Sequence, residues 1–241
     1  MDTIKICTEN KPLMIAHQGG SGLELGNTNA AFVAAGNRSY FGIETDVHRT
    51  IDGKYILFHD RTTAHLAIDD LETEKSTFDT LRKLTLLNKY SGEKDRADLV
   101  IPTLSEYLAI CRHYEKMAVL DMGIHNSLDL DEICEIVEQA NCLDNVLFLS
   151  GDFDRLIYLR DKYPNMPLQF LTYTKLPENW LNTLKEHKLD LDMCYKGLTK
   201  ELLDLCHENG IKVNVWTVDD KELAEELAAW GVDMITTNIL E

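Results

Sequence analysis

Short hydrophobic runs alternate with amphipathic stretches along most of the chain. Eight segments rich in aliphatic or β-branched residues have the length of buried strands, namely 13–16, 41–47, 117–121, 145–150, 166–173, 189–194, 211–218 and 232–237. Between them, segments such as 130–140, 153–163 and 199–210 have the apolar periodicity of helices. From residue 117 onward the strands repeat every 20–28 residues or so, which is too short for two strands and a helix. The pattern therefore predicts a series of β-α units.

Eight β-α units in 241 residues favour an α/β (β/α)8 TIM barrel over an open, doubly wound sheet. The open sheet is further disfavoured because no glycine-rich phosphate loop or dinucleotide fingerprint follows the first strand. The eighth strand is followed directly by the last residues of the sequence, so we expect the eighth helix to be absent. Length alone is compatible with one large domain or two small ones. We expect one barrel domain over residues 1–241.

The strand spacing breaks once, because about 70 residues separate segment 41–47 from segment 117–121. Here Asp52-Gly53 predicts a tight turn followed by a further strand-like segment, and residues 103–115 predict a helix. The polar stretch 61–102 predicts a small insertion after the second strand. In such barrels the loops that follow strands carry the active site, so we expect a lid or subdomain there.

Acidic side chains gather where two of the predicted strands end. Glu44 and Asp46 are two residues apart on one strand and so point to the same side, and Asp121 ends the next barrel strand. Carboxylates this close repel one another unless a cation or a proton lies between them. An all-oxygen site of this kind suits Mg²⁺ or Ca²⁺. The alternative is that Glu44 and Asp46 face helices or pair with Arg49 and Lys54.

Two histidines occupy comparable positions, with His17 at the end of the first strand and His59 after the strand-like segment. A metal and two imidazoles suggest hydrolysis of a phosphate ester, in which the metal stabilises the phosphate charge and the imidazoles take and give protons. His48 follows the same two-residue spacing as Glu44 and Asp46, but we expect it to lie beyond the end of the strand and to have a structural role. Lys196 and Trp216, near the ends of the sixth and seventh strands, are candidate substrate-binding residues.

The overall charge narrows the range of partners. The chain has 24 basic and 41 acidic residues and a net charge of −17, which argues against a nucleic-acid or anionic-membrane surface. The six cysteines occur singly, and no disulfide or zinc pattern is present. The first residues lack the apolar core of a secretory signal, and no segment approaches 18 apolar residues. We therefore expect a reduced, cytoplasmic protein without an integral membrane segment; its oligomeric state is left open.

The sequence resembles the glycerophosphodiester phosphodiesterase family, nearly end to end and in order. The likeness lies in IAHQGG (15–20), NTNAAF (27–32), GIETDVHRTIDGKYILFHD (42–60), IPTL (101–104), VNVWTV (213–218) and GVDMITTN (231–238). The resemblance implies a divalent metal, commonly Mg²⁺ or Ca²⁺, and cleavage of a phosphodiester such as glycerophosphocholine to glycerol 3-phosphate and an alcohol. His17 and His59 match the acid/base histidines, Glu44 and Asp46 match metal ligands, and Asp121 falls where the family usually has a glutamate ligand.

Three positions depart from the family pattern. Gln18 replaces an arginine that contacts phosphate, Gly26 replaces a glutamate, and Gly123 replaces a lysine. Each lost positive charge corresponds to an interaction of about 4 kcal/mol at 4 Å and an effective dielectric constant near 20. Joint loss of the arginine and the glutamate resembles removal of an ion pair. The candidates for a compensating charge are Arg49, His125 and, preferentially, Lys196.

These departures suggest a hydrolase with altered substrate preference. The main alternative is a weak or inactive family member that binds a phosphodiester or a metabolite. A more distant alternative is a lyase-like relative that forms a cyclic phosphate by attack of the substrate's own hydroxyl group.

Overall fold

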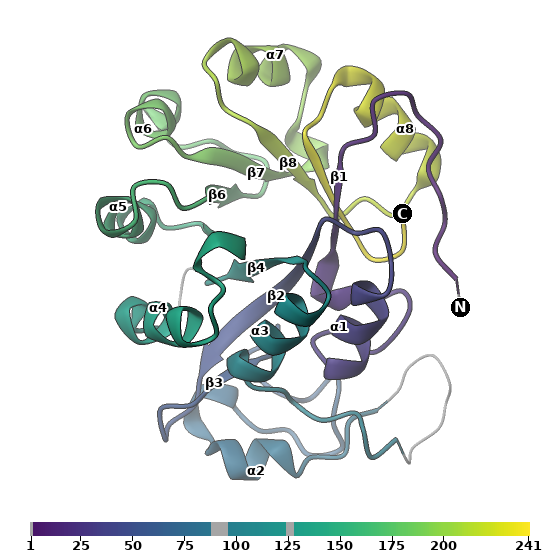
Figure 1. The fold of residues 1–241 in the computed structure, drawn as a ribbon, viewed down its shortest axis with the longest axis vertical. Helices are drawn as coiled ribbons and strands as arrows, with labels where there is room; N and C mark the ends of the chain where they lie inside the picture. Colours follow the sequence, from purple (N-terminus) through teal and green to yellow (C-terminus); the bar gives the residue numbers. More distant parts are fainter. Residues whose placement is uncertain (1, 88–95, 124–127) are drawn as a thin grey trace.

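Eight parallel strands form a closed barrel with helices on its outside (Figure 1). The computed structural model describes residues 2–87, 96–123 and 128–241. The barrel strands are β1 (Leu13–Ala16), β2 (Gly42–Arg49), β4 (Met117–Asp121), β5 (Val146–Ser150), β6 (Leu168–Thr172), β7 (Asp190–Cys194), β8 (Val213–Trp216) and β9 (Met234–Thr237). Because β1 pairs with both β2 and β9, the sheet closes on itself, and the predicted TIM barrel is confirmed.

The connecting helices begin at capping residues in the sequence. They are α1 (Asn29–Gly36), α3 (Leu104–His113), α4 (Leu130–Gln139), α5 (Phe153–Lys162), α6 (Trp180–Glu186), α7 (Lys200–Glu208) and α8 (Lys221–Trp230). Thr28, Asp129, Asp152, Thr199 and Asp220 each accept a backbone N–H of the first helical turn. Short 3₁₀ turns are present at η1 (His17–Gly19), η3 (Leu143–Asn145) and η4 (Tyr195–Gly197).

Side chains alternate between the helices and the barrel interior along each strand. Ile43, Ala118 and Leu120 belong to the core between strands and helices. Val119 lies with Ile15, Leu147, Leu149 and Met234 in a separate apolar cluster inside the barrel. Because alternate strand residues share a face, Asp121 points to the same interior as Val119. The apolar cluster thus forms a floor, and the polar strand ends lie above it.

The insertion follows β2, as the strand spacing predicts. β2 pairs in antiparallel register with β3 (Tyr55–Leu57), and the described part of the insertion contains η2 (Thr73–Lys75) and α2 (Phe78–Arg82). A second small core packs this region against the loop that precedes α1. It consists of Leu25, Ile56, Phe58, Ala67, Leu81, Leu84, Leu86, Leu99 and Ile101. In Figure 1 the insertion lies below α1 and α3.

The chain ends pair with each other at the place where an eighth helix would follow β9. Residues 238–241 contain no helix. The Ile4 N–H donates to the Ile239 carbonyl (3.0 Å), the Glu241 N–H donates to the Ile4 carbonyl (2.7 Å), and Leu240 is fully buried. The Cys7 N–H donates to Glu225 of α8 (2.9 Å), so the N-terminal segment covers this side of the barrel. In the described residues, no helix combines the length and apolar character needed to cross a membrane.

Candidate active site

The three predicted carboxylates converge at the ends of two adjacent strands. Asp46 of β2 lies in register with Asp121 of β4, and Glu44 lies one inward-facing position earlier on β2. One oxygen from each of the three lies within 4.8 Å of the other two. Arg49 instead forms an ion pair with Glu132 of α4 (3.1 Å), so it does not neutralise the β2 acids.

Burial and mutual repulsion make these carboxylates difficult to ionise together. Burial, followed by the charges of Asp46 and Asp121, raises the pKa of Glu44 well above its usual value. Burial and Asp46 raise the pKa of Asp121 to about 7. A divalent cation among the three oxygens would remove the repulsion, and an all-carboxylate donor set fits a hard ion such as Mg²⁺ or Ca²⁺. The residues present therefore fit the metal that the sequence predicts.

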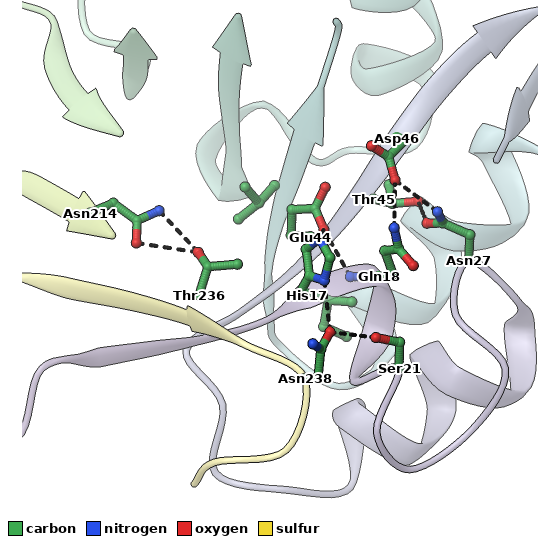
Figure 2. A network of polar contacts seen from close by, with 12 residues as sticks. His17, Gln18, Ser21, Asn27, Glu44, Thr45, Asp46, Asn214, Thr236 and Asn238 are labelled. Atoms are coloured by element: carbon green, nitrogen blue, oxygen red, sulfur yellow. Dashed lines mark hydrogen bonds and ion pairs between the residues drawn. The ribbon is translucent and has the colours of Figure 1, made fainter. Parts of the chain in front are cut away.

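His17 is held in one orientation by residues from the other end of the chain. Its Nδ1 lies 2.7 Å from Asn238 Oδ1 (Figure 2). Asn238 Nδ2 donates to Asp219 Oδ2 (2.6 Å), which directs the amide oxygen toward His17 and Ser21. The amide oxygen only accepts hydrogen bonds, so His17 carries its proton on Nδ1. Its other ring nitrogen, Nε2, lies 4.0 Å from Glu44 Oε2.

His59 lies at the edge of the same group of acids. Its Nδ1 lies 2.7 Å from Asp60 Oδ1, and its side chain is 58% exposed. Burial lowers the pKa of His59, but the charges of Asp46, Asp60 and Asp121 outweigh it and the net pKa is raised. The raised pKa shifts His59 toward the imidazolium form relative to a free histidine.

His48 does not lie beyond its strand, and that prediction is wrong. β2 continues to Arg49 because β3 pairs with its last residues, in the register His48 with Ile56. The His48 side chain is buried, and its Nε2 lies 3.3 Å from the His59 carbonyl. It contacts the backbone that carries His59.

The backbone of Gln18 and the side chain of Asn27 donate hydrogen bonds to the two β2 acids. The Gln18 backbone N–H donates to Glu44 Oε2 (2.8 Å), and Asn27 Nδ2 donates to Asp46 Oδ2 (2.8 Å; Figure 2). Asn27 Oδ1 accepts from Thr45 Oγ1 (2.6 Å), which fixes the amide. Gln18 Nε2 lies 3.5 Å from Asp46 Oδ2, so the Gln18 side chain lies beside the predicted metal ligands. Asn27 was not singled out from the sequence, although it belongs to the NTNAAF motif.

A cavity of about 260 Å³ joins these groups. Its lining consists of His17, Glu44, Asp46, His59, Asp121, Leu149, Leu171, Asp192, Trp216 and Thr236. Trp216 therefore lies where the sequence suggests, whereas Lys196 is exposed on η4 with its ammonium 5.8 Å from the Tyr195 ring centroid and is not among the lining residues. A larger groove of about 490 Å³ beside α3 and α4 includes none of these histidines.

Two charged residues near the site were not singled out from the sequence. Arg155 of α5 donates to the carbonyls of Met122 (2.8 Å) and Gly123 (3.1 Å). Burial and Asp46 raise the pKa of Asp121, and the positive charge of Arg155 partly offsets this increase. Asp192 of β7 lines the cavity as a fourth acid. The only indication of Asp192 in the sequence is an acidic residue at an inward-facing position of a mostly apolar strand. His125, a predicted source of charge, lies outside the described residues.

The chain is similar to known glycerophosphodiester phosphodiesterases along most of its length. The sequence model of the glycerophosphoryl diester phosphodiesterase family matches residues 17–241. A glycerophosphodiester phosphodiesterase of Caldanaerobacter subterraneus subsp. tengcongensis is 30% identical over 233 residues, which cover 95% of this chain and 94% of that protein. An Oleispira antarctica phosphodiesterase, solved with its product sn-glycerol-3-phosphate, is similar in structure (TM-score 0.84, 24% identity, 95% of this chain and 93% of that one).

A glycerophosphodiester phosphodiesterase of Thermotoga maritima has the same fold, with a TM-score of 0.75, 22% identity and 94% coverage of both chains. The family match covers every barrel strand except β1, and it includes all of the converging acids and histidines. The chain therefore belongs to the glycerophosphoryl diester phosphodiesterase family.

Proposed function

We propose that this protein hydrolyses a glycerophosphodiester to glycerol 3-phosphate and an alcohol in a metal-dependent reaction. The observation that carries the proposal is the convergence of three buried carboxylates and two differently oriented histidines on one cavity. Family membership supports the reaction class, and the product bound to the Oleispira antarctica neighbour supports a small phosphodiester as substrate. The cavity of about 260 Å³ is small beside ordinary ligand sites of about 300–1,000 Å³, which favours a compact substrate.

Glu44, Asp46 and Asp121 would hold one Mg²⁺ or Ca²⁺ ion. When bound, the ion neutralises phosphate charge and stabilises the charge that develops during transfer. The protein's part is to keep the three acids in place. The Gln18 N–H and the Asn27 amide do so by donating to Glu44 and Asp46.

The two histidines divide the proton transfers. His17 has its Nδ1 proton engaged by Asn238, so its Nε2 is the group that takes a proton from the attacking water. His59 gives a proton to the oxygen of the leaving alcohol, a role that its raised pKa supports. Asp60 accepts from the other nitrogen of His59 and holds the ring in orientation.

Gln18 and Trp216 complete the substrate site in this proposal, and Lys196 contributes positive charge from η4, outside the cavity lining. Arg155 adds a second positive charge behind Asp121, close to the position where the family has lysine. Residues 1–241 act as one catalytic unit, with the insertion over about 61–102 beside the site. A cytoplasmic location fits the six unpaired cysteines, five of which are buried.

A second candidate function is binding of a phosphodiester with little turnover. The replacement of two cationic positions by Gln18 and Gly123 favours it, because a neutral amide donates hydrogen bonds without supplying charge. The histidines and acids needed for chemistry are nevertheless all present, which favours the hydrolase.

The test is turnover of glycerophosphocholine, glycerophosphoethanolamine and glycerophosphoglycerol with Mg²⁺, with Ca²⁺ and with EDTA, followed by ³¹P NMR. Glycerol 3-phosphate that forms with metal and not with EDTA is the expected result. A cyclic phosphate product would identify the lyase-like reaction. Tight binding of these diesters with no product under either metal would identify a binding protein.

A further inference from the structure

Asp192 lies across the barrel from the three predicted metal ligands. In the strand order, three strands separate β7 from β2 in either direction around the ring. Asp192 is in register with Leu171 of β6 and Asn214 of β8, and it lines the same cavity as Glu44, Asp46 and Asp121. The metal-binding group of the described residues comprises Glu44, Asp46 and Asp121 without it. A substrate that extends from the predicted metal site toward the opposite wall of the barrel therefore meets Asp192.

One carboxyl oxygen of Asp192 is buried and has no hydrogen-bond partner among the described residues. The residue is 3% exposed, and its Oδ1 has no hydrogen-bond partner among the residues that the structure describes. The neighbouring polar groups are engaged with one another, since the Asn214 amide contacts Thr236 Oγ1 (3.1 Å; Figure 2) and Gln169 Oε1 (3.3 Å). An unsatisfied buried carboxyl group destabilises a fold, and a leucine would fill the same wall, as Leu171 does on β6. A ligand that supplies the missing hydrogen bond explains an unpaired polar group at this position.

A second unpaired atom lies on the adjacent strand. Trp216 of β8 is one inward-facing position beyond Asn214, lines the same cavity, and its buried Nε1 also has no partner within the described part of the chain. The indole N–H only donates and the carboxylate accepts. An alcohol hydroxyl does both, so the pair matches the hydrogen-bonding capacity of a hydroxyl group.

We propose that Asp192 binds a hydroxyl of the glycerol moiety and thereby selects glycerophosphodiesters over phosphodiesters that lack it. This inference rests on the proposed function and adds the residue that recognises the non-reacting part of the substrate. The phosphate then lies against the β2 and β4 acids, and the glycerol extends across the barrel toward β7. The assignment holds for either charge state, because a carboxylate accepts from a hydroxyl and a carboxylic acid also donates to it.

The test compares Asp192→Leu and Asp192→Asn with the parent on two substrates in the presence of Mg²⁺. Glycerophosphocholine carries the glycerol hydroxyls, whereas bis(p-nitrophenyl) phosphate has none. Asp192→Leu should lower kcat/KM for glycerophosphocholine by about 10–100-fold, the usual effect of removing a buried hydrogen-bond partner of a substrate. Its kcat/KM for the nitrophenyl ester should change by less than about threefold. Asp192→Asn should retain most of the activity, because its amide oxygen still accepts.

Binding gives a second readout that does not need turnover. By calorimetry with Mg²⁺, the parent should prefer glycerol 3-phosphate to inorganic phosphate, and Asp192→Leu should lose the preference while its affinity for phosphate stays the same. Asp190→Asn is the matched control. Asp190 lies two residues earlier on β7, is not among the lining residues, and accepts the Lys212 N–H (2.9 Å). This variant should behave like the parent in both assays.

Two outcomes overturn the inference. Equal losses on both substrates would assign Asp192 to the metal site or to the fold, and an unaffected Asp192→Leu would remove it from substrate binding. Failure of the proposed function looks different, because the parent would then hydrolyse no glycerophosphodiester. In that case the comparison of glycerol 3-phosphate with phosphate still decides whether Asp192 recognises glycerol.

Discussion

Gln18 and Gly26 pack against each other so closely that a Cβ atom on Gly26 would lie 2.6 Å from Gln18 Oε1. These are the two positions at which the family pattern has arginine and glutamate. Their contact means that the two departures affect one place in the site. While Gln18 keeps its present conformation, only glycine fits at position 26.

The contact predicts that the two positions are coupled in activity. Gly26→Glu alone should displace the Gln18 side chain, and Gln18→Arg alone should leave an unpaired charge, so each should lower kcat/KM or leave it unchanged. The double variant restores an ion pair and should exceed both singles on a glycerophosphodiester. A double-mutant cycle on the four proteins measures the coupling. Additive effects, or a double variant that is the poorest of the four, would disprove the ion-pair explanation.

Removing two of the carboxylates should abolish the metal site. Calorimetric titration with Mg²⁺ or Ca²⁺ should show about one site in the parent and none in Glu44→Gln with Asp46→Asn, because a single remaining carboxylate binds these ions weakly. Glu186→Gln, an exposed change on α6, is the control and should bind as the parent does. Parent-like binding by the double variant would place the metal elsewhere.

The raised carboxyl pKa values predict how stability depends on pH without metal. Asp121 has a pKa of about 7 in the fold, raised by burial and Asp46, so between about pH 4 and pH 7 the folded state binds more protons than the unfolded state. Stability in EDTA should therefore fall as the pH rises through this range. His59, whose pKa is also raised, acts in the same direction from about pH 6.5 upward.

Melting temperatures measured in EDTA across this pH range test the prediction. Asp121→Asn should reduce the dependence and leave the parts due to Glu44 and His59. Mg²⁺ should stabilise the parent more at about pH 7.5 than at pH 5, because metal binding must displace the protons. A parent whose stability in EDTA rises with pH would contradict the expected charge repulsion.

Loss of either histidine should impair the chemistry and spare the fold. His17→Ala and His59→Ala should each lower kcat by about 10²–10⁴-fold, the range for a positioned proton donor or acceptor. Their melting temperatures should stay close to that of the parent. His65→Ala, an exposed histidine of the insertion, should keep full activity. Substantial turnover by His59→Ala would exclude that residue from the mechanism.

Asn238 should act on the rate through the orientation of His17. Asn238→Ala should lower kcat by about 10–100-fold and weaken the preference for the Nδ1-protonated ring, since loss of a tautomer-fixing partner impairs a catalytic histidine. Asn238→Asp still accepts from Nδ1 and should recover part of the rate. ¹⁵N NMR of the imidazole reports the tautomer directly. An unchanged tautomer in Asn238→Ala would assign Asn238 a packing role.

The barrel and the acids could be predicted because both depend on local pattern. Strand spacing sets the number of β-α units, and the rule that parallel strands end at one face brings Glu44, Asp46 and Asp121 together. The residues that were missed depend on closure of the ring. Nothing local to β7 or to the end of β9 indicates that Asp192 faces β2 or that Asn238 reaches His17. The error at His48 has a similar origin, because pairing with β3 lengthens β2.

The contact between His17 and Asn238 joins residues 221 positions apart in the chain. Contacts of such long sequence separation form late in folding, because they require a large loss of chain entropy before they become favourable. His17, the proposed base, follows the first strand directly, and the contact that orients its ring forms only when the segment after the last strand has docked beside it. Under the proposed mechanism, recovery of activity during refolding therefore measures ring closure, and a partly assembled barrel should lack activity even when its acids and histidines are all present.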